Sequence, residues 1–361
     1  MKLASTYTLL TFYKFVDILT PQAEVVKHKQ FCDDIGMKGR IYIWEEGISS
    51  TVTGNNGQIQ AYKRYLADSP YFRDIPDIDT KETQLDDHQF DKMIVRYRPE
   101  IVVLGKTVTE AQVKMADRQI SIEAFQHILE QEDEAWAILD MRNDYERQLG
   151  HFKGALPAGT INFREVPELL EKYKEKLQDK KVVMYCTGGI RCEKLSVLLK
   201  DAGLENFYAL NGGVVKYINT YNDGNRLGNL YTFDGRVSCP VGDAQTHVSI
   251  GRCIYTDEPT DMCENCRYSP CNARIIADPQ AYRKHMGFCS QECTEQAMQD
   301  LLIKNADWDS IDYKSLRGII KQDPTQEEAI FTKVRNYLRK KLLHRTFRHQ
   351  VSQKEKVLHE W

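Results

Sequence analysis

One ten-residue stretch, V-V-M-Y-C-T-G-G-I-R at positions 182–191, constrains the fold more than any other part of the chain. Its apolar first half predicts a buried parallel strand, because the run is rich in β-forming residues and stops before a glycine pair. The sequence that follows has helical periodicity and ends at Gly203, a residue type that often terminates helices. We therefore expect a strand, a tight loop and a helix, with Cys186 at the carboxyl end of the strand.

The loop between this strand and helix predicts a reactive cysteine. Gly188 and Gly189 allow a tight turn whose backbone N–H groups point inward, and Arg191 adds a positive charge at the start of the helix. Both features lower the pKa of a thiol and favour the thiolate. The alternative, a buried structural cysteine, requires neither two adjacent glycines nor an arginine. The candidate active-site loop comprises Cys186, Thr187, Gly188, Gly189, Ile190 and Arg191.

The region that contains this loop, residues 118–225, alternates strands and helices. Strands are predicted at 136–140, 182–185 and 207–210, and helices at 120–129, 166–177, from Arg191 to Gly203, and after Gly212. This alternation predicts a parallel sheet covered on both faces, in which ligands bind at the carboxyl ends of the strands. Asp140 and Arg142 end one strand as Cys186 ends another, so we expect all three near one site.

The first 105 residues predict a second, smaller α/β domain. The pattern predicts strands at 7–16, 38–44 and 48–53, one or two more strands within 93–104, and helices that run from Pro21 to before Gly36 and over 55–66. This is the order βαββαβ of a ferredoxin-like sandwich. The acidic segment 74–91 predicts an irregular surface loop. The fold hosts many functions, so a packing or dimerisation module is an alternative to a functional role. Glu45 and Glu46, at a turn between two strands, are either solvated or functional.

The last region, residues 226–361, is where composition becomes informative. Seven of the ten cysteines lie between positions 239 and 293, which favours metal binding in a reducing compartment over disulfides. A C-x-x-C knuckle followed by further cysteines suits a tetrahedral structural zinc ion, whereas the alternative is a metal-free reduced cluster. The spacing leaves the fourth ligand open, with Cys253, His247 and His285 in reserve. The candidate ligands are Cys263, Cys266, Cys271, Cys289 and Cys293.

Charge is concentrated at the end of the chain. Residues 331–361 hold nine Lys and Arg against two Glu, in a protein whose formal net charge is −3. Apolar residues at helical spacing predict a helix there, whose basic side is either a solvated face or a phosphate-contacting arm. No apolar stretch is long enough to span a bilayer and no clear signal-peptide cleavage site follows the N-terminus, so we expect a cytoplasmic protein. The candidate RNA-binding residues are Arg339, Lys340, Lys341, Arg345 and Arg348.

Several motifs together resemble a rhodanese domain: L-D-M-R-N-D-Y-E, G-H-F-K-G-A, C-T-G-G-I-R-C-E-K and L-N-G-G-V. The six-residue loop is that of sulfur-handling rhodaneses, not the longer loop of dual-specificity phosphatases. With the ferredoxin-like region, which carries F-Y-K-F and E-E-G-I, and the Cys-rich segment, the chain to about residue 300 resembles the rhodanese-domain tRNA uridine hydroxylases. It departs from that family between the two cysteine knuckles, where I-I-A-D-P-Q-A-Y-R-K-H replaces additional cysteine pairs.

The resemblance implies an oxidoreductase that places oxygen at C5 of the wobble uridine of tRNA, position 34, with dioxygen as co-substrate and Cys186 as the essential cysteine. We expect Asp140 to anchor the loop or Arg191, unless it is only a structural cap, and Arg142 to supply positive charge at the rim. Cys192 either packs as a thiol or resolves an oxidised Cys186. The sequence contains no flavin-binding or nucleotide-binding motif.

Two other functions fit parts of the sequence. A sulfurtransferase would carry a persulfide on Cys186, using the same thiolate chemistry. A non-enzymatic binding module would need neither Cys186 nor Arg191, and the presence of both argues against it. The additional N-terminal domain, the Cys-rich segment and the basic tail favour the tRNA hydroxylase, because small-molecule sulfur transfer requires none of them.

Overall fold

The computed structural model describes residues 7–73, 80–159, 163–166, 173, 177, 179–222, 224–242 and 247–304. The chain divides into two compact units. One comprises residues up to Cys263 together with Ile276–Asp278, and the other comprises Glu264–Ile275 and the chain from Pro279 onward. In the part of the chain that is described, no helix has the length and apolar character needed to cross a membrane.

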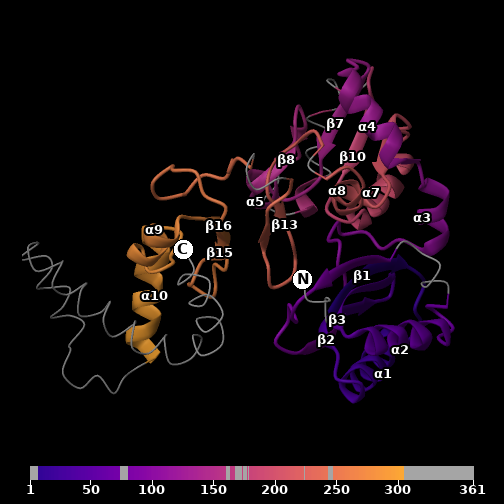
Figure 1. Ribbon diagram of the computed structural model, residues 1–361, viewed down its shortest axis with the longest axis horizontal. Coiled ribbons are helices and arrows are strands. Elements are labelled where there is room, and N and C mark those ends of the chain that lie inside the picture. The colour runs from indigo at the N-terminus through magenta and orange to yellow at the C-terminus, as the bar shows by residue number, and fades with distance from the viewer. Residues whose placement is uncertain are drawn as a thin grey trace, which may run out of the picture. The chain divides into compact units, whose positions relative to one another are not determined.

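The N-terminal domain is a five-stranded sheet with two helices on one face (Figure 1). Its elements are β1 (Tyr7–Phe15), α1 (Pro21–Asp34), β2 (Lys38–Trp44), β3 (Gly47–Gly54), α2 (Asn56–Ala67), β4 (Lys81–Leu85) and β5 (Met93–Tyr97). The strand order is β4-β1-β3-β2-β5, and every neighbouring pair is antiparallel except β2 and β5. The ferredoxin-like prediction is therefore confirmed, with β5 added at one edge.

Packing explains which face of this sheet stays open. Leu10 of β1, Ile41 of β2 and Val52 of β3 are fully buried and belong to one apolar core with Ile59 and Tyr62 of α2. Since side chains alternate along a strand, the neighbouring residues project from the opposite face. Among the described residues of this domain, no helix covers that opposite face, and the face forms a wall of the cavity described below.

One prediction for this domain is wrong. The segment 74–91 is not wholly an irregular loop, because it contains β4, which pairs with β1 at the edge of the sheet. Of the one or two strands predicted within 93–104, the structure has one, β5, which ends at Tyr97. The sequence of β4, K-E-T-Q-L, has no apolar run, because none of its side chains enters the core. An edge strand of this kind lacks the hydrophobic pattern from which strands are predicted.

The central domain is built on a parallel sheet with the strand order β6-β11-β10-β7-β9. Its elements are α3 (Glu110–Ala116), β6 (Gln119–Ile120), α4 (Ile122–Gln131), β7 (Trp136–Asp140), α5 (Asp144–Leu149), β8 (Gly150–Phe152), β9 (Leu156–Pro157), a 3₁₀ turn (Phe163–Glu165), β10 (Lys181–Tyr185), α7 (Ile190–Asp201), β11 (Phe207–Leu210) and α8 (Gly213–Tyr221). Most of the helix predicted at 166–177 lies outside the described residues.

The central strand β10 is buried on both faces, as the sequence predicts. Val182 and Met184 pack in one core with Leu195 of α7, whereas Val183 and Tyr185 pack in another. That second core contains residues of α4 and α8, so helices cover both sides of the sheet. Burial on both faces accounts for the continuous apolar run of β10 and sets Cys186 at its carboxyl end.

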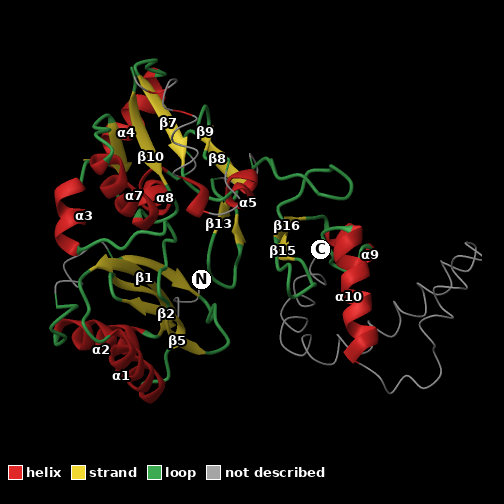
Figure 2. Cartoon of the chain, turned by 180° about the vertical axis from the view of Figure 1, so that it is seen from behind, coloured by secondary structure: helices red, strands yellow, loops and turns green. Residues whose placement is uncertain are grey.

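The remaining elements are short. They are β12 (Arg226–Gly228), β13 (Leu230–Tyr231), β14 (Ser238–Cys239), β15 (Cys263–Asn265), β16 (Arg274–Ile276), α9 (Pro279–Lys284) and α10 (Gln291–Lys304). β12 pairs with β8, and β13 pairs with β14, within the first unit. The helices α9 and α10 belong to the second unit (Figure 2). The helix predicted in the basic tail lies outside the described residues.

Candidate active site

Cys186 lies in a loop that stabilises a negative charge on sulfur. Its side chain is buried, and the backbone N–H of Gly189 donates to its Sγ at 3.1 Å. Burial alone would raise the pKa of the Cys186 thiol. A hydrogen bond from the Cys192 thiol, the charge of Arg191 and the amides of Gly189 and Arg191 together hold that pKa well below its ordinary value. The geometry therefore favours a thiolate, in agreement with the sequence analysis.

Arg191 is held by a carboxylate from a different element. Its guanidinium donates to both carboxylate oxygens of Glu146 in α5, at 2.6 and 2.8 Å. The Thr187 hydroxyl donates to the same carboxylate at 2.8 Å. Glu146 is fully buried, so this bidentate pair fixes the guanidinium beside the loop. Of the two roles expected for Asp140, anchoring the loop or anchoring Arg191, the second is wrong, because Glu146 has that role.

Asp140 and Arg142 form a separate buried clamp. Arg142 donates to the two carboxylate oxygens of Asp140 at 2.9 and 2.7 Å and to the Gly150 carbonyl at 2.6 Å. The Tyr185 hydroxyl donates to Asp140 at 2.6 Å. Both charged side chains are fully buried, so the prediction that Arg142 adds charge at the rim is wrong. The clamp ties the end of β7 to the residue that precedes Cys186.

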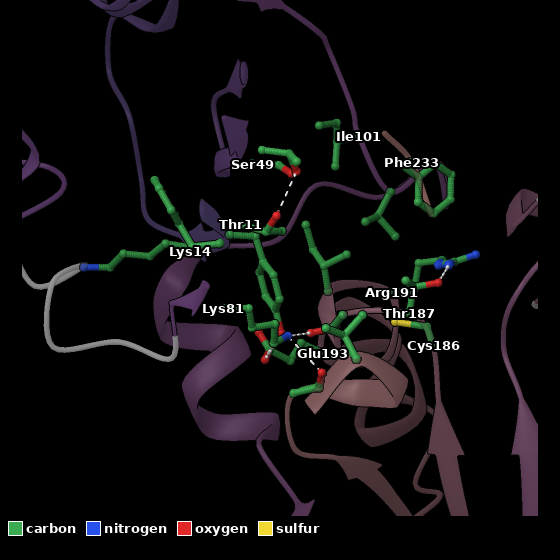
Figure 3. Close-up of a pocket in the computed structure, with 18 of the residues that line it drawn as sticks. Thr11, Lys14, Ser49, Lys81, Ile101, Cys186, Thr187, Arg191, Glu193 and Phe233 are labelled. Atoms are coloured by element: carbon green, nitrogen blue, oxygen red, sulfur yellow. Dashed lines mark hydrogen bonds between the residues drawn. The ribbon is translucent and has the colours of Figure 1, made fainter. Parts of the chain in front are cut away.

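A cavity of about 820 Å³ opens in front of Cys186 within the first unit. The loop residues Cys186, Thr187, Gly188, Ile190 and Arg191 form part of its wall, and the open face of the N-terminal sheet forms another part. In Figure 3, Thr11 and Ser49 of that sheet lie in the same pocket as Cys186 and Arg191. Neither Asp140 nor Arg142 lines the cavity. Residues from two consecutive domains, far apart in sequence, thus build one pocket.

Sequence reasoning missed two polar residues of this pocket. The Tyr13 hydroxyl of β1 donates to Glu193 of α7 at 2.6 Å, and both side chains line the cavity. Burial raises the pKa of the Glu193 carboxyl to about 7, although the hydrogen bond from Tyr13 opposes this. Glu193 is part of the C-T-G-G-I-R-C-E-K motif, but the motif does not reveal a partner 180 residues earlier in the chain.

The next residue of the motif joins the same two domains. Lys194 of α7 is fully buried, and its ammonium lies 2.9 Å from a carboxylate oxygen of Glu46 and 2.7 Å from one of Glu100. The Trp44 indole also donates to Glu46 at 3.0 Å. Glu46 is therefore a buried structural carboxylate and not a solvated turn residue. Cys192 is likewise buried, and its thiol is hydrogen-bonded to the sulfur of Cys186.

Four of the five candidate metal ligands come together in the second unit. The sulfur atoms of Cys266, Cys271, Cys289 and Cys293 all lie within 4.8 Å of one another. Cys263 is not part of this group, and it packs instead in an apolar cluster of the first unit. The candidate RNA-binding residues Arg339, Lys340, Lys341, Arg345 and Arg348 lie outside the described residues.

Comparison with protein families gives three matches along the chain. Residues 7–101 match the UPF0176 acylphosphatase-like domain, residues 121–220 match the rhodanese-like domain, and residues 227–294 match the rhodanase C-terminal family. The first match agrees with the ferredoxin-like sheet, and the second contains the Cys186 loop. The fold class predicted from the sequence is thereby confirmed.

Curated relatives match most of the chain. A Bacillus velezensis protein named tRNA uridine(34) hydroxylase is 37% identical over 289 residues, which is 80% of this chain and 88% of the relative. A Bacillus pumilus protein of the same name is 35% identical over 319 residues, which is 88% of this chain and 97% of the relative. The resemblance stated from the motifs is confirmed, and the chain belongs to the tRNA uridine(34) hydroxylase family.

Proposed function

We propose that this protein is an oxidoreductase that hydroxylates C5 of uridine 34 in tRNA, with dioxygen as co-substrate, at the cavity that holds Cys186. The observation that carries the proposal is a thiolate-stabilising loop in the wall of a two-domain cavity, in a chain of this family. The names of the relatives favour hydroxylation over the alternative of sulfur transfer. Because the substrate is tRNA, we expect the activity in the cytoplasm.

The cavity is suited to a nucleoside. Its volume of about 820 Å³ falls in the range of small-molecule sites, and a wobble base that leaves the anticodon stack would enter it. The hydroxyl-bearing side chains Thr11, Ser49 and Thr51 line the sheet wall and provide hydrogen-bond partners for a base or ribose. Arg191 and Arg236 are also in the lining, and each is paired with a carboxylate, Glu146 and Asp234 respectively, so a phosphate would share these cations with them.

The basic tail supports a polyanionic substrate independently of the cavity. Its cationic residues are Arg339, Lys340, Lys341, Arg345 and Arg348. We expect truncation after residue 330 to weaken tRNA binding and to reduce the dependence of affinity on salt, because each lost phosphate contact lowers that slope by about one. Unchanged affinity and salt slope in a filter-binding titration would refute a role for the tail.

The cysteine cluster fits a structural zinc ion. Tetrahedral zinc with four sulfur ligands places the sulfur atoms about 3.8 Å apart. Here Cys289 lies 3.6 Å from Cys271 and 3.5 Å from Cys293, measured between sulfur atoms. When bound, zinc would provide four bonds that hold these short segments together. We expect Cys266→Ser to lower the zinc content and the thermal stability of the purified protein, and Cys263→Ser to leave the zinc content unchanged.

The function is tested by nucleoside mass spectrometry of tRNA. A strain that lacks this gene and any other uridine hydroxylase is complemented with the wild type, with Cys186→Ser or with the control Cys32→Ser. We expect 5-oxygenated uridine to return with the wild type and the control and to remain absent with Cys186→Ser. Product in the uncomplemented strain, or with Cys186→Ser, would overturn the proposal. A thiosulfate:cyanide transfer assay tests the sulfurtransferase alternative.

A further inference from the structure

Lys81 links the N-terminal domain to the catalytic loop. It is the first residue of β4, the edge strand beside β1, but its ammonium reaches the central domain. It donates to the carbonyl oxygen of Gly188 at 2.9 Å and to that of Gly212 at 2.8 Å. Figure 3 shows Lys81 in the pocket beside Glu193 of α7. The contact thus joins two segments 107 residues apart.

One peptide group lies between Lys81 and the Cys186 sulfur. The carbonyl of Gly188 and the N–H of Gly189 belong to the same planar trans peptide, so they point in opposite directions. The carbonyl accepts from Lys81, and the N–H donates to Cys186 Sγ at 3.1 Å. A cation that holds the carbonyl therefore aims the N–H at the sulfur and polarises it, which strengthens that hydrogen bond.

This peptide needs an external tether because it is flanked by two glycines. Glycine adopts positive and negative φ angles with similar ease, so the peptide between Gly188 and Gly189 can rotate at little cost. Gly189 has φ +110°, and a Cβ there would lie 2.4 Å from the Tyr13 hydroxyl, so no larger residue fits the position. A flipped peptide would direct a carbonyl oxygen at the thiolate, which repels it.

We propose that Lys81 is a positioning residue of the catalytic loop, which holds the Gly188–Gly189 peptide with its N–H on the Cys186 sulfur. The N-terminal domain thereby becomes part of the machinery that ionises the cysteine. This role rests on the proposed function in one respect, which is that the hydroxylation uses the Cys186 thiolate. The domain itself is held by other contacts, since Tyr13 bonds Glu193 and Lys194 pairs with Glu46. Loss of Lys81 alone should therefore leave both domains in place.

The test measures the ionisation of Cys186 directly in the full-length protein. The rate of alkylation of Cys186 by iodoacetamide is followed against pH by peptide mass spectrometry for the wild type, Lys81→Met and Lys81→Arg. Lys63→Met is the matched control. Lys63 lies on α2 and pairs with Glu82 of β4, the strand that carries Lys81, but it does not contact the loop. The other titratable groups that act on or near Cys186 are Tyr13, Arg191, Cys192 and Glu193, and all four residues are retained in these variants. Lys81→Met also removes a charge that lowers the pKa of the Glu193 carboxyl, and Lys81→Arg controls for this effect because it keeps that charge.

For Lys81→Met we expect the midpoint of the rate profile to rise by about one pH unit, which slows alkylation about tenfold below the midpoint. Lys81→Arg keeps the cation and should restore most of the rate, and Lys63→Met should match the wild type. A Lys81→Met profile equal to that of the wild type would overturn the proposal. If Lys81→Met fails to fold, Lys81→Ala takes its place: a midpoint raised above that of the wild type supports the proposal, and an unchanged midpoint overturns it.

Failure of this proposal is distinguishable from failure of the proposed function. If Lys81→Met leaves the midpoint of the alkylation profile unchanged while the wild type restores hydroxylated tRNA, only the proposed role of Lys81 is refuted. If Lys81→Met shifts that midpoint but the wild type does not restore the modified nucleoside, only the proposed function is refuted.

Discussion

Cys32 in the N-terminal domain and Cys186 in the central domain are both completely buried, but their environments have opposite effects on ionisation. Cys32 lies on α1 in an apolar core, where burial raises the pKa of its thiol to about 12. Cys186 is buried to the same degree, and the pKa of its thiol is held well below the ordinary value. Burial therefore does not decide which cysteine is reactive.

The difference comes from the groups that surround each sulfur. The sulfur of Cys186 receives the N–H of Gly189 and the Cys192 thiol and lies near the charge of Arg191. These groups are preorganised, because Glu146 holds Arg191 and Lys81 holds the Gly188 carbonyl of the peptide that carries the Gly189 N–H. Cys32 has one nearby cation, Lys29, whose effect is smaller than that of burial. Donors and a cation held in place around the sulfur, at a cost in conformational entropy, are thus what distinguishes a reactive thiolate from a thiol buried in a core.

The largest expected effect separates the two cysteines by function. Cys186→Ser should abolish formation of 5-oxygenated uridine in the complemented strain. Cys32→Ala should retain it and should lower the free energy of unfolding by about 1–2 kcal/mol, because it removes a buried sulfur from the core. The measurements are nucleoside mass spectrometry and urea unfolding. Loss of activity in Cys32→Ala that is still folded would contradict the comparison.

Removal of the loop's fixed cation should have the next largest effect. In Arg191→Met, the sulfur loses a positive charge and the buried Glu146 carboxylate is left without its partner. We expect the midpoint of Cys186 alkylation against pH to rise by about two units. Arg191→Lys should shift it less, because the charge remains while the bidentate geometry is lost. Equal midpoints in all three proteins would show that Arg191 does not act on the thiolate.

Cys192→Ala should produce a smaller shift. It removes one hydrogen bond to the sulfur and leaves every charge in place. We expect the midpoint for Cys186 to rise by about one unit or slightly less, since a hydrogen bond to a charged group contributes about 1.5 kcal/mol. Hydroxylated tRNA should still form at a reduced level. A complete loss of product in Cys192→Ala would instead point to Cys192 as a resolving thiol.

The smallest effect concerns Cys32 and the stability at high pH. In the unfolded chain its thiol ionises near pH 9, but in the folded protein only near pH 12. Between these values the unfolded state releases a proton that the folded state keeps, so stability falls as pH rises, by at most about 1.4 kcal/mol per unit. Urea unfolding at pH 8 and pH 10 should therefore show a larger loss in the wild type than in Cys32→Ala. Equal losses would contradict the pKa of about 12.

Local features of the sequence were sufficient for the loop and for the main elements around it. The strand, the glycine pair and the helix around Cys186 are contiguous, so their geometry follows from residues within one short stretch. The crowding of cysteines in one segment likewise indicates the cluster of Cys266, Cys271, Cys289 and Cys293. The C-x-x-C spacing is misleading for its first residue, because Cys263 packs in an apolar cluster and spacing alone does not show which sulfur atoms converge.

Long-range partners could not be predicted in the same way. Glu146 lies 45 residues from Arg191 and Lys81 lies 107 residues from Gly188, and no periodic pattern links either pair. The edge strand that carries Lys81 has only one apolar residue, Leu85, so no hydrophobic alternation predicts it. The position of Arg142 just after a strand predicts a place at the rim of the site. Its guanidinium instead donates to Asp140 and to the Gly150 carbonyl in the protein interior.

The most direct test of the account is the pH dependence of Cys186 alkylation by iodoacetamide in the native wild-type protein, with Cys32 monitored in the same digests. We expect the Cys186 rate to reach its plateau already at neutral pH, with a midpoint well below the value of about 8.5 for a free thiol, while Cys32 stays unmodified until the protein unfolds. A Cys186 rate that rises through pH 8.5 as a free thiol does would contradict the account.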